Sequence, residues 1–297
     1  YKEAVAEAVE ACAEDTKGQT CYICREALHQ RTGEGLVRGC GCHTTEGFVH
    51  VSCLAEQAKI LRKEAEENNK ASQWHRWYTC SLCEQNYYGV VRCALGWACW
   101  KTYLNDSDKT RVVSAMTQLG NGLGQANKHE ERIAIIETQL SIMLRLWPQN
   151  ELDALDMKHN LARCYLPLGR LEEAARLFRL VYARKKVLVG AKDSSTMQTA
   201  HQLAGTLLEL GRYDQVKSLA LPLLRQLIPN SILGQSIRLE YAKALYRTAE
   251  ASRGEVFEAV AIFEELRRKL RRVLGPSHPD TLDDLRELDR ACMTLED

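Results

Sequence analysis

The chain has 297 residues, which corresponds to two domains of ordinary size at about 150 residues each. Forty Lys and Arg residues against 39 Asp and Glu residues give a formal net charge of +1, so no overall field attracts nucleic acid or an anionic membrane. The longest apolar stretch, Val90 to Trp100, is interrupted by Arg92 and is far shorter than the roughly 20 residues that span a bilayer. These values exclude a membrane span and favour neither nucleic acid nor membrane as a partner.

The start of the chain shows no basic segment followed by an apolar run, and its first residue is Tyr1 rather than Met. We therefore expect a piece of a longer protein whose native N-terminus is missing. Twelve cysteines without a secretory signal predict metal ligation in a reducing compartment rather than a disulfide framework. We expect an intracellular protein of the cytoplasm, with the nucleus left open as an alternative.

The cysteines divide the chain, because ten of the twelve lie between Cys12 and Cys99. The boundary falls near 102–110, where the polar run 105–108 ends the cysteine-rich part and has the residue types that cap a helix. Downstream, apolar residues recur at helical spacing among Leu, Ala, Arg and Glu. This half of the chain is predicted to be entirely helical.

Eight cysteine and histidine residues of the first part form four closely spaced pairs. They are Cys21 and Cys24, Cys40 and Cys42, His50 and Cys53, and Cys80 and Cys83. Zinc takes four nitrogen or sulfur ligands in a tetrahedron, and a pair separated by one or two residues can turn both donors onto one ion. The spacing predicts two closed sites for two zinc ions that serve a structural role.

A closed site leaves no position for a reactive water, which disfavours a hydrolase or deaminase. His43 follows Cys42 directly and could replace it if the site rearranged. The remaining thiols have no partner at ligand spacing and are expected in the core, where free cysteine is common. They are Cys12, Cys93, Cys99, Cys164 and Cys292.

The order of four cysteines, one histidine and three cysteines, with one residue inside the second pair and seven before His50, resembles the RING-CH or RING-variant zinc finger over residues 13–92. PHD fingers share the order but fit the spacing less well. The RING-CH resemblance implies a cross-brace in which alternate pairs share one ion. Carried onto this chain, it assigns Cys21, Cys24, His50 and Cys53 to the first zinc and Cys40, Cys42, Cys80 and Cys83 to the second.

The same resemblance implies an E3 ubiquitin ligase that binds a ubiquitin-charged E2 enzyme and has no catalytic nucleophile of its own. The family's apolar E2-binding surface maps to Ile23, Leu54 and Leu82. Two positions differ from many relatives, which carry Trp where this chain has Gln57 and a basic residue where it has Glu84. Trp74 and Trp77 are expected to pack against the zinc core, and replacement of the missing Trp by one of them stays open.

The helical half contains an internal repeat of 42 residues. Leu119, Leu161 and Leu203 are 42 apart, and so are Asn127, Gly169 and Gly211, which suit the left-handed position that ends a helix. Further units are predicted at 237–272, with a capping helix at 280–294. The glycines of 120–124 predict a flexible or kinked first repeat.

These units resemble the 42-residue tetratricopeptide repeats of kinesin light chains, whose loop signature is closely matched by 274–282. The resemblance implies a groove that binds a protein substrate or adaptor. We expect a mainly α protein consisting of a RING-CH finger at 13–92, a linker at 93–109, and tetratricopeptide repeats at 110–297 that form a solenoid. Alternatives are a non-catalytic zinc-finger adaptor, a PHD-like reader that binds methyl-lysine with Trp74, Trp77 and Tyr78, and a helical half that only rigidifies the chain or makes a dimer.

Overall fold

The computed structural model of the chain describes residues 1–42, 47–68, 74–225, 232–273, 275 and 279–296. Within these residues the secondary structure is helical apart from two isolated β-bridges, which confirms the mainly α fold expected from the sequence. No helix in this described part combines the length and apolarity that a bilayer crossing requires. The chain divides into two compact units, Tyr1–Asn150 and Glu151–Asp297.

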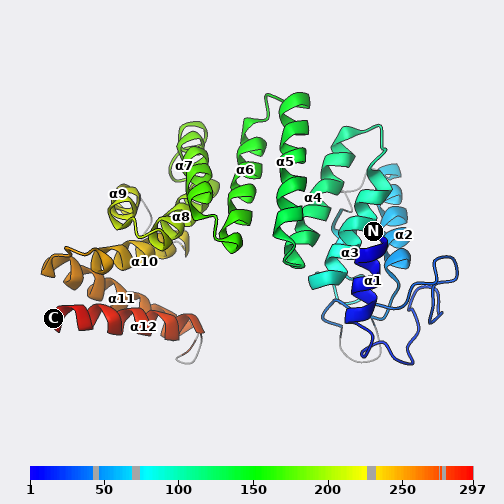
Figure 1. Cartoon of the computed structure of the whole chain (residues 1–297), viewed down its shortest axis with the longest axis horizontal. Coiled ribbons are helices and arrows are strands. Elements are labelled where there is room, and N and C mark those ends of the chain that lie inside the picture. The colour runs from blue at the N-terminus through cyan, green and yellow to red at the C-terminus, as the bar shows by residue number, and fades with distance from the viewer. Residues whose placement is uncertain (43–46, 69–73, 226–231, 274, 276–278, 297) are drawn as a thin grey trace. The chain divides into compact units, whose positions relative to one another are not determined.

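The first unit combines the cysteine-rich segment with helices on either side of it (Figure 1). Its described helical elements are α1 (Lys2–Ala11), α2 (Val51–Glu67), the 3-10 turn η1 (Trp74–Trp77), α3 (Gly89–Tyr103), α4 (Lys109–Gln125) and α5 (His129–Leu146). The side chain of Asp108 caps the start of α4 by accepting a hydrogen bond of 2.9 Å from the backbone of Thr110. The helix start expected after the polar run 105–108 is thus present.

Helix α3 occupies most of the segment 93–109, where the sequence analysis expects a linker. Leu95 and Ala98 belong to the core of the cysteine-rich segment, whereas Cys93 packs with Leu119 and Leu123 of α4. Apolar side chains on two faces of one helix have to be buried on both sides. The finger and the first repeat helix therefore share α3 instead of being joined by a linker.

Two glycines allow α3 and α4 to approach until their backbones touch. A Cβ atom on Gly96 would lie 2.9 Å from the carbonyl oxygen of Gln118, and one on Gly122 would lie 2.7 Å from that of Arg92. Both distances are too short for a side chain. The glycines of 120–124 thus serve close packing inside the regular helix α4, which replaces the flexible or kinked repeat expected there.

Arg92 ties the finger to α4 through a buried guanidinium group. It donates hydrogen bonds to the carbonyl oxygen of Trp77 at 3.2 Å and to Gln118 Oε1 at 2.7 Å. Desolvation lowers the pKa of Arg92 to about 10, so the side chain stays charged at neutral pH. A buried charge is tolerated where hydrogen bonds compensate its lost hydration, and both acceptors here belong to packed elements.

The second unit is a series of helices that pack in chain order (Figure 1). Its described elements are α6 (Glu151–Tyr165), the 3-10 turn η2 (Leu166–Leu168), α7 (Leu171–Leu188), α8 (Ser194–Glu209), α9 (Tyr213–Leu224), α10 (Ile232–Arg247), α11 (Arg253–Val273) and α12 (Pro279–Glu296). Residues 274 and 276–278 of the expected loop signature lie outside the described residues, while Gly275 has a φ of +90°.

The 42-residue repeat is confirmed by backbone geometry at its turns. Asn127, Gly169 and Gly211 have φ values of 57°, 69° and 69°, so all three adopt the left-handed conformation. The residue after each donates a 6→1 hydrogen bond of 2.9 to 3.0 Å to a carbonyl oxygen in the preceding helical turn. This is the Schellman ending, which satisfies otherwise unpaired carbonyl groups.

Stacking of neighbouring helices supplies the core of the second unit, as the repeat predicts. Phe178 and Phe263 are fully buried. Ion pairs connect residues close to one repeat apart, such as Arg212 with Glu172 at 2.6 Å and Lys217 with Glu255 at 3.1 Å. Exposed pairs of this kind contribute at most about 1 kcal/mol each, so the apolar layers dominate the stability.

Candidate metal centre

Two groups of four side chains converge in the cysteine-rich segment. One consists of Cys21, Cys24, His50 and Cys53, and the other of Cys40, Cys42, Cys80 and Cys83. Within each group the potential ligand atoms all lie within 4.8 Å of one another. Alternate pairs along the chain share a group, which is the interleaving that the RING-CH resemblance implies. His43, the rival ligand, lies outside the described residues.

The distances inside the groups match a tetrahedral ion. Ligand bonds of the usual length to zinc place two sulfurs about 3.8 Å apart and a sulfur and a nitrogen about 3.6 Å apart. Cys42 Sγ lies 3.7 Å from Cys80 Sγ, and His50 Nδ1 lies 3.4 Å from Cys24 Sγ and 3.6 Å from Cys53 Sγ. Both groups could therefore hold a metal ion without rearrangement.

The imidazole of His50 is oriented for ligation. Its Nδ1 faces the sulfurs, while its Nε2 lies 3.4 Å from the carbonyl oxygen of Ala27 and can donate a hydrogen bond to it. A metal-bound histidine commonly donates its second ring N–H to a carbonyl or carboxylate, which fixes the tautomer. Complete burial lowers the pKa of His50, and this favours the neutral form that a ligand must have.

The first and last pairs lie on two loops with the same local structure. The amides of Ile23 and Leu82 each donate a hydrogen bond of 3.4 Å to the sulfur of the cysteine two residues earlier. The residues after each pair, Arg25 and Glu84, have φ values of 67° and 56°. Both loops are closed by backbone hydrogen bonds to the first cysteine. Two independent segments thus adopt one metal-binding turn.

The third pair is positioned by α2, since His50 precedes that helix and Cys53 lies in its first turn. The positive end of a helix dipole stabilises a thiolate there. The second pair is closed off by Gly47, whose φ is +96° and whose Cβ atom, if present, would lie 2.8 Å from Cys42 Cβ. A glycine is required at this position by both the backbone conformation and the space.

The segment between the third and fourth pairs packs on the core, in agreement with the expectation for its tryptophans. Trp77 is fully buried and makes an edge contact with Tyr103 of α3. The guanidinium of Arg62 lies 4.3 Å from the ring centroid of Trp74, and that of Arg92 lies 5.1 Å from the ring centroid of Tyr78. Trp74, Trp77 and Tyr78 therefore form no open cage for methyl-lysine.

The three apolar residues expected on an E2-binding surface differ in exposure. Ile23 is 38% exposed and Leu82 is 46% exposed, each at the tip of a metal-binding turn. Leu54, in contrast, is only 4% exposed because the first turn of α2 buries it in the finger core. It supports the surface from below and does not form part of it.

Sequence reasoning missed a link between α2 and the last turn. Ser81 Oγ donates a hydrogen bond of 2.9 Å to Gln57 Oε1, so the residue that replaces the family's Trp is in direct contact with the loop that carries Leu82. The glutamine gives no sequence signal for this role, because its partner is 24 residues away. In the described part of the chain neither metal group includes the five other cysteines, of which Cys12, Cys93, Cys99 and Cys164 are buried and Cys292 is partly buried.

Comparisons with known proteins bear on the helical half. A tetratricopeptide repeat family matches residues 248–280. The crystal structure of a kinesin light chain with nearly identical TPR-like repeats from Podosopora anserina is 22% identical over 61% of this chain and 86% of its own, with a TM-score of 0.50, and a variant of that protein covers 85% of its own chain with a TM-score of 0.51. BtubC (BKLC) from P. vanneervenii is 15% identical over 77% of this chain and 82% of its own, with a TM-score of 0.48. No curated protein matches the sequence. These findings show a tetratricopeptide repeat fold, and such a fold binds protein partners.

Proposed function

We propose that the chain is a RING-CH-type E3 ubiquitin ligase. In this proposal two structural zinc ions hold the finger, the finger binds a ubiquitin-charged E2 enzyme, and the tetratricopeptide repeats bind a protein substrate or adaptor. The observation that carries the proposal is the interleaving of four ligand pairs into two tetrahedral groups. Zinc would contribute folding free energy and no reactive water, because all its positions would be taken by protein ligands.

The residues that would contact the E2 are Ile23 and Leu82. Both are aliphatic, both lie at the tips of the metal-binding turns, and both remain exposed. An aliphatic residue held at the tip of a rigid turn is well suited to insert into an apolar partner surface. The link from Ser81 to Gln57 fixes the turn of Leu82 against α2, which offers the stiffness that relatives obtain from a Trp.

Transfer of ubiquitin needs no nucleophile from this chain. The E2 thioester supplies the activated carbonyl group, and a substrate lysine attacks it. The finger's contribution is to bind the E2, and the array's contribution is to bring a lysine near, so the rate gain comes from proximity and orientation.

The second candidate is a non-catalytic adaptor in which the finger caps the repeat array. The shared helix α3 favours it, because the finger core and the first repeat helix bury opposite faces of one helix. This observation is equally compatible with a ligase. A PHD-like reader is disfavoured, since Arg62 and Arg92 already cover the aromatic rings that would form its cage.

The test is an autoubiquitination assay of the purified chain with E1, ubiquitin, ATP and a panel of E2 enzymes, together with a zinc count. We expect E2-dependent conjugates that fall about tenfold or more in Ile23→Ala and Leu82→Ala, with zinc content unchanged. Leu28→Ala is the matched control, because Leu28 is 63% exposed in the same segment but is not at a turn tip. Conjugation that survives both tip substitutions contradicts the proposed E2 surface, and two bound zinc ions without conjugation across the panel favour the adaptor.

A further inference from the structure

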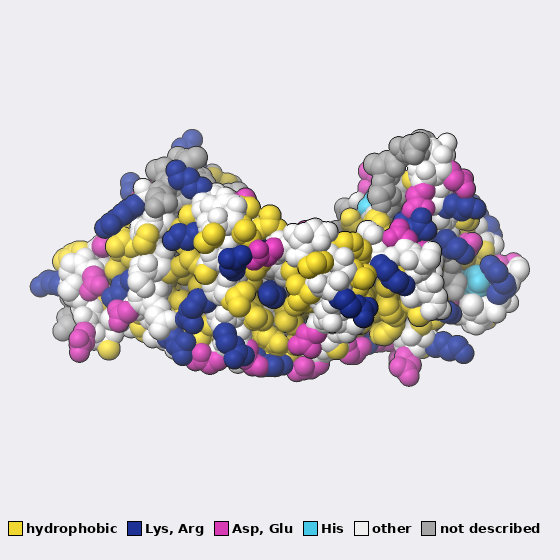
Figure 2. All heavy atoms as spheres, turned by 90° about the horizontal axis from the view of Figure 1, so that it is seen from above, with side chains coloured by type: hydrophobic (Ala, Val, Ile, Leu, Met, Phe, Trp, Pro, Cys, Tyr) yellow, Lys and Arg dark blue, Asp and Glu magenta, His cyan; other side chains and the backbone are white. Residues whose placement is uncertain are grey.

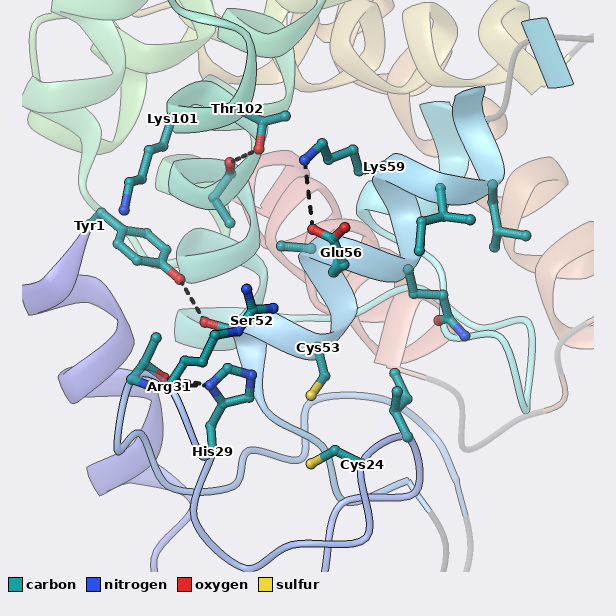
Figure 3. A pocket seen from close by; sticks show the side chains of 17 residues that line it. Tyr1, Cys24, His29, Arg31, Ser52, Cys53, Glu56, Lys59, Lys101 and Thr102 are labelled. Carbon is teal, nitrogen blue, oxygen red and sulfur yellow. Dashed lines mark hydrogen bonds and ion pairs between the residues drawn. The ribbon is translucent and has the colours of Figure 1, made fainter. Parts of the chain in front are cut away.

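The first unit contains a hollow of about 850 Å³ that neither the metal groups nor the E2 surface accounts for (Figure 3). It is lined from three directions: the turn after the first cysteine pair, the outer side of α2 and the end of α3. Ile23 is the single residue that the hollow shares with the exposed pair of proposed E2 contacts, and Leu82 does not line it. It is therefore open to a partner of its own.

Cations outnumber carboxylates in the lining of this hollow. Arg31, Lys59 and Lys101 line it, against Glu56 as the one acidic residue of the lining. Lys59 pairs with Glu56 at 3.7 Å in an exposed and weak contact. Within the described part of the chain neither Arg31 nor Lys101 has a carboxylate partner, and the Lys101 ammonium lies 4.7 Å from the centroid of the Tyr1 ring.

The positive and apolar parts of the hollow are arranged along it. Figure 3 shows Lys59 and Lys101 at the same end, on either side of Thr102, while Cys24 and Cys53 lie at the other. A zinc ion bound by three thiolates and one histidine would carry a net charge of −1, so the cysteine end is the less favourable place for an anion. An acidic group is thus expected between Lys59 and Lys101.

Apolar side chains supply the second half of the recognition. Ile60 is 48% exposed and Ile23 is 38% exposed, and Ala55 and Ala98 also line the hollow. An aliphatic or aromatic side chain that covered the isoleucines would remove apolar surface from water on both partners, at about 25 cal/mol for each Å². The hollow is large enough for several side chains at once.

We propose that this hollow binds a short acidic peptide segment of a partner protein, with an aliphatic or aromatic side chain on Ile23 and Ile60 and a carboxylate between Lys59 and Lys101. The charge complementarity selects an acidic over a basic segment, and it predicts that affinity falls as salt is raised. The proposal does not rest on ligase activity, because none of the charged residues belongs to the E2 surface.

The test begins with selection of random twelve-residue peptides, displayed on phage, against the full chain loaded with zinc. Recovered peptides are synthesised, and their affinities are measured by fluorescence anisotropy for the chain and for Lys59→Glu/Lys101→Glu. The matched control is Lys17→Glu/Lys63→Glu, which has the same change in charge. Lys17 and Lys63 also pair with a nearby glutamate but do not line the hollow. Zinc content checks that each variant is folded.

We expect peptides with carboxylates beside an aliphatic or aromatic residue, whose affinity falls about tenfold or more in Lys59→Glu/Lys101→Glu and stays unchanged in the control. Ile60→Ala should also weaken them. Peptides that bind both charge variants equally occupy another surface. The proposal is overturned if every recovered peptide behaves in that way, if the peptides lost with Lys59 and Lys101 are not acidic, or if none is recovered. A loss of ubiquitin conjugation in Ile23→Ala with intact peptide binding by Lys59→Glu/Lys101→Glu would sink this proposal and leave the ligase standing.

Discussion

The cysteine-rich segment and the second unit are held together in different ways. In the second unit, consecutive helices bury repeated apolar layers, and the same left-handed turn closes successive helix pairs. In the cysteine-rich segment the described backbone is mostly loop between α1 and α3, and eight cysteine and histidine side chains meet in two groups. The comparison teaches that one chain can combine a fold encoded by periodicity with a fold encoded by a few ligands at exact distances in sequence.

The difference should be largest when metal is removed. Chelation is expected to unfold the cysteine-rich segment, because bound zinc contributes on the order of 10 to 16 kcal/mol to small modules of this kind. Helices α7 to α11 should keep their protection, since their core contains no ligand group among the described residues. Hydrogen exchange followed by mass spectrometry measures both regions in one sample. Unchanged protection of α2 after complete metal removal would contradict this reading.

The reverse experiment removes packing from the second unit. Phe178→Ala should destabilise that unit by about 3 to 5 kcal/mol, because the side chain is fully buried against His159. Denaturant unfolding measures the loss, and zinc content should stay the same. Phe257→Ala is the control, since Phe257 is 54% exposed and its truncation should cost less than about 1 kcal/mol. Equal losses in the two variants would show that the repeat layers are misassigned.

Acid should also act on the second unit through His159. Burial lowers the pKa of His159 to about 4, compared with about 6.5 for an unfolded histidine. The folded unit then binds fewer protons than the unfolded chain between these values, so its stability should decrease as pH falls from about 6.5 to about 4, by about 3 kcal/mol in all. The measurement is the unfolding free energy at several pH values, compared between the chain and His159→Gln. Parallel slopes in the two proteins would exclude His159 as the source.

The smallest effect concerns the helix pair where the two kinds of structure meet. Gly122→Ala should destabilise the first unit by about 1 to 3 kcal/mol, because the new methyl group would press on the backbone of Arg92. Gly120→Ala, in the same helix, should instead stabilise it by about 0.5 to 1 kcal/mol, since the nearest atom to its Cβ would be 3.8 Å away. Thermal unfolding compares the variants, and a stabilising Gly122→Ala would refute the close approach of α3 and α4.

Much of this architecture could be predicted from sequence, because spacing carries it. The pair spacing identified the eight residues that the structure groups in fours, and the 42-residue interval located the turns at Asn127, Gly169 and Gly211. These signals are local or periodic. The interleaving of the pairs followed from the family resemblance and not from the spacing alone.

The remaining features depend on contacts that no spacing encodes. The burial of Leu54, the link from Ser81 to Gln57 and the hollow beside α2 all arise from elements packed in three dimensions. The shared helix α3 did leave a signal, since Cys93 and Leu95 place apolar side chains on both of its faces. That pattern indicates a helix buried on two sides rather than a linker.

The most direct test of the account is the metal itself. X-ray absorption at the zinc edge, combined with elemental analysis of the purified chain, should show two zinc ions per chain. Together they should have seven sulfur donors and one nitrogen donor, with zinc–sulfur distances of about 2.3 Å. A single ion, oxygen donors at either site, or iron in place of zinc would contradict the two closed structural zinc sites on which the finger is proposed to depend.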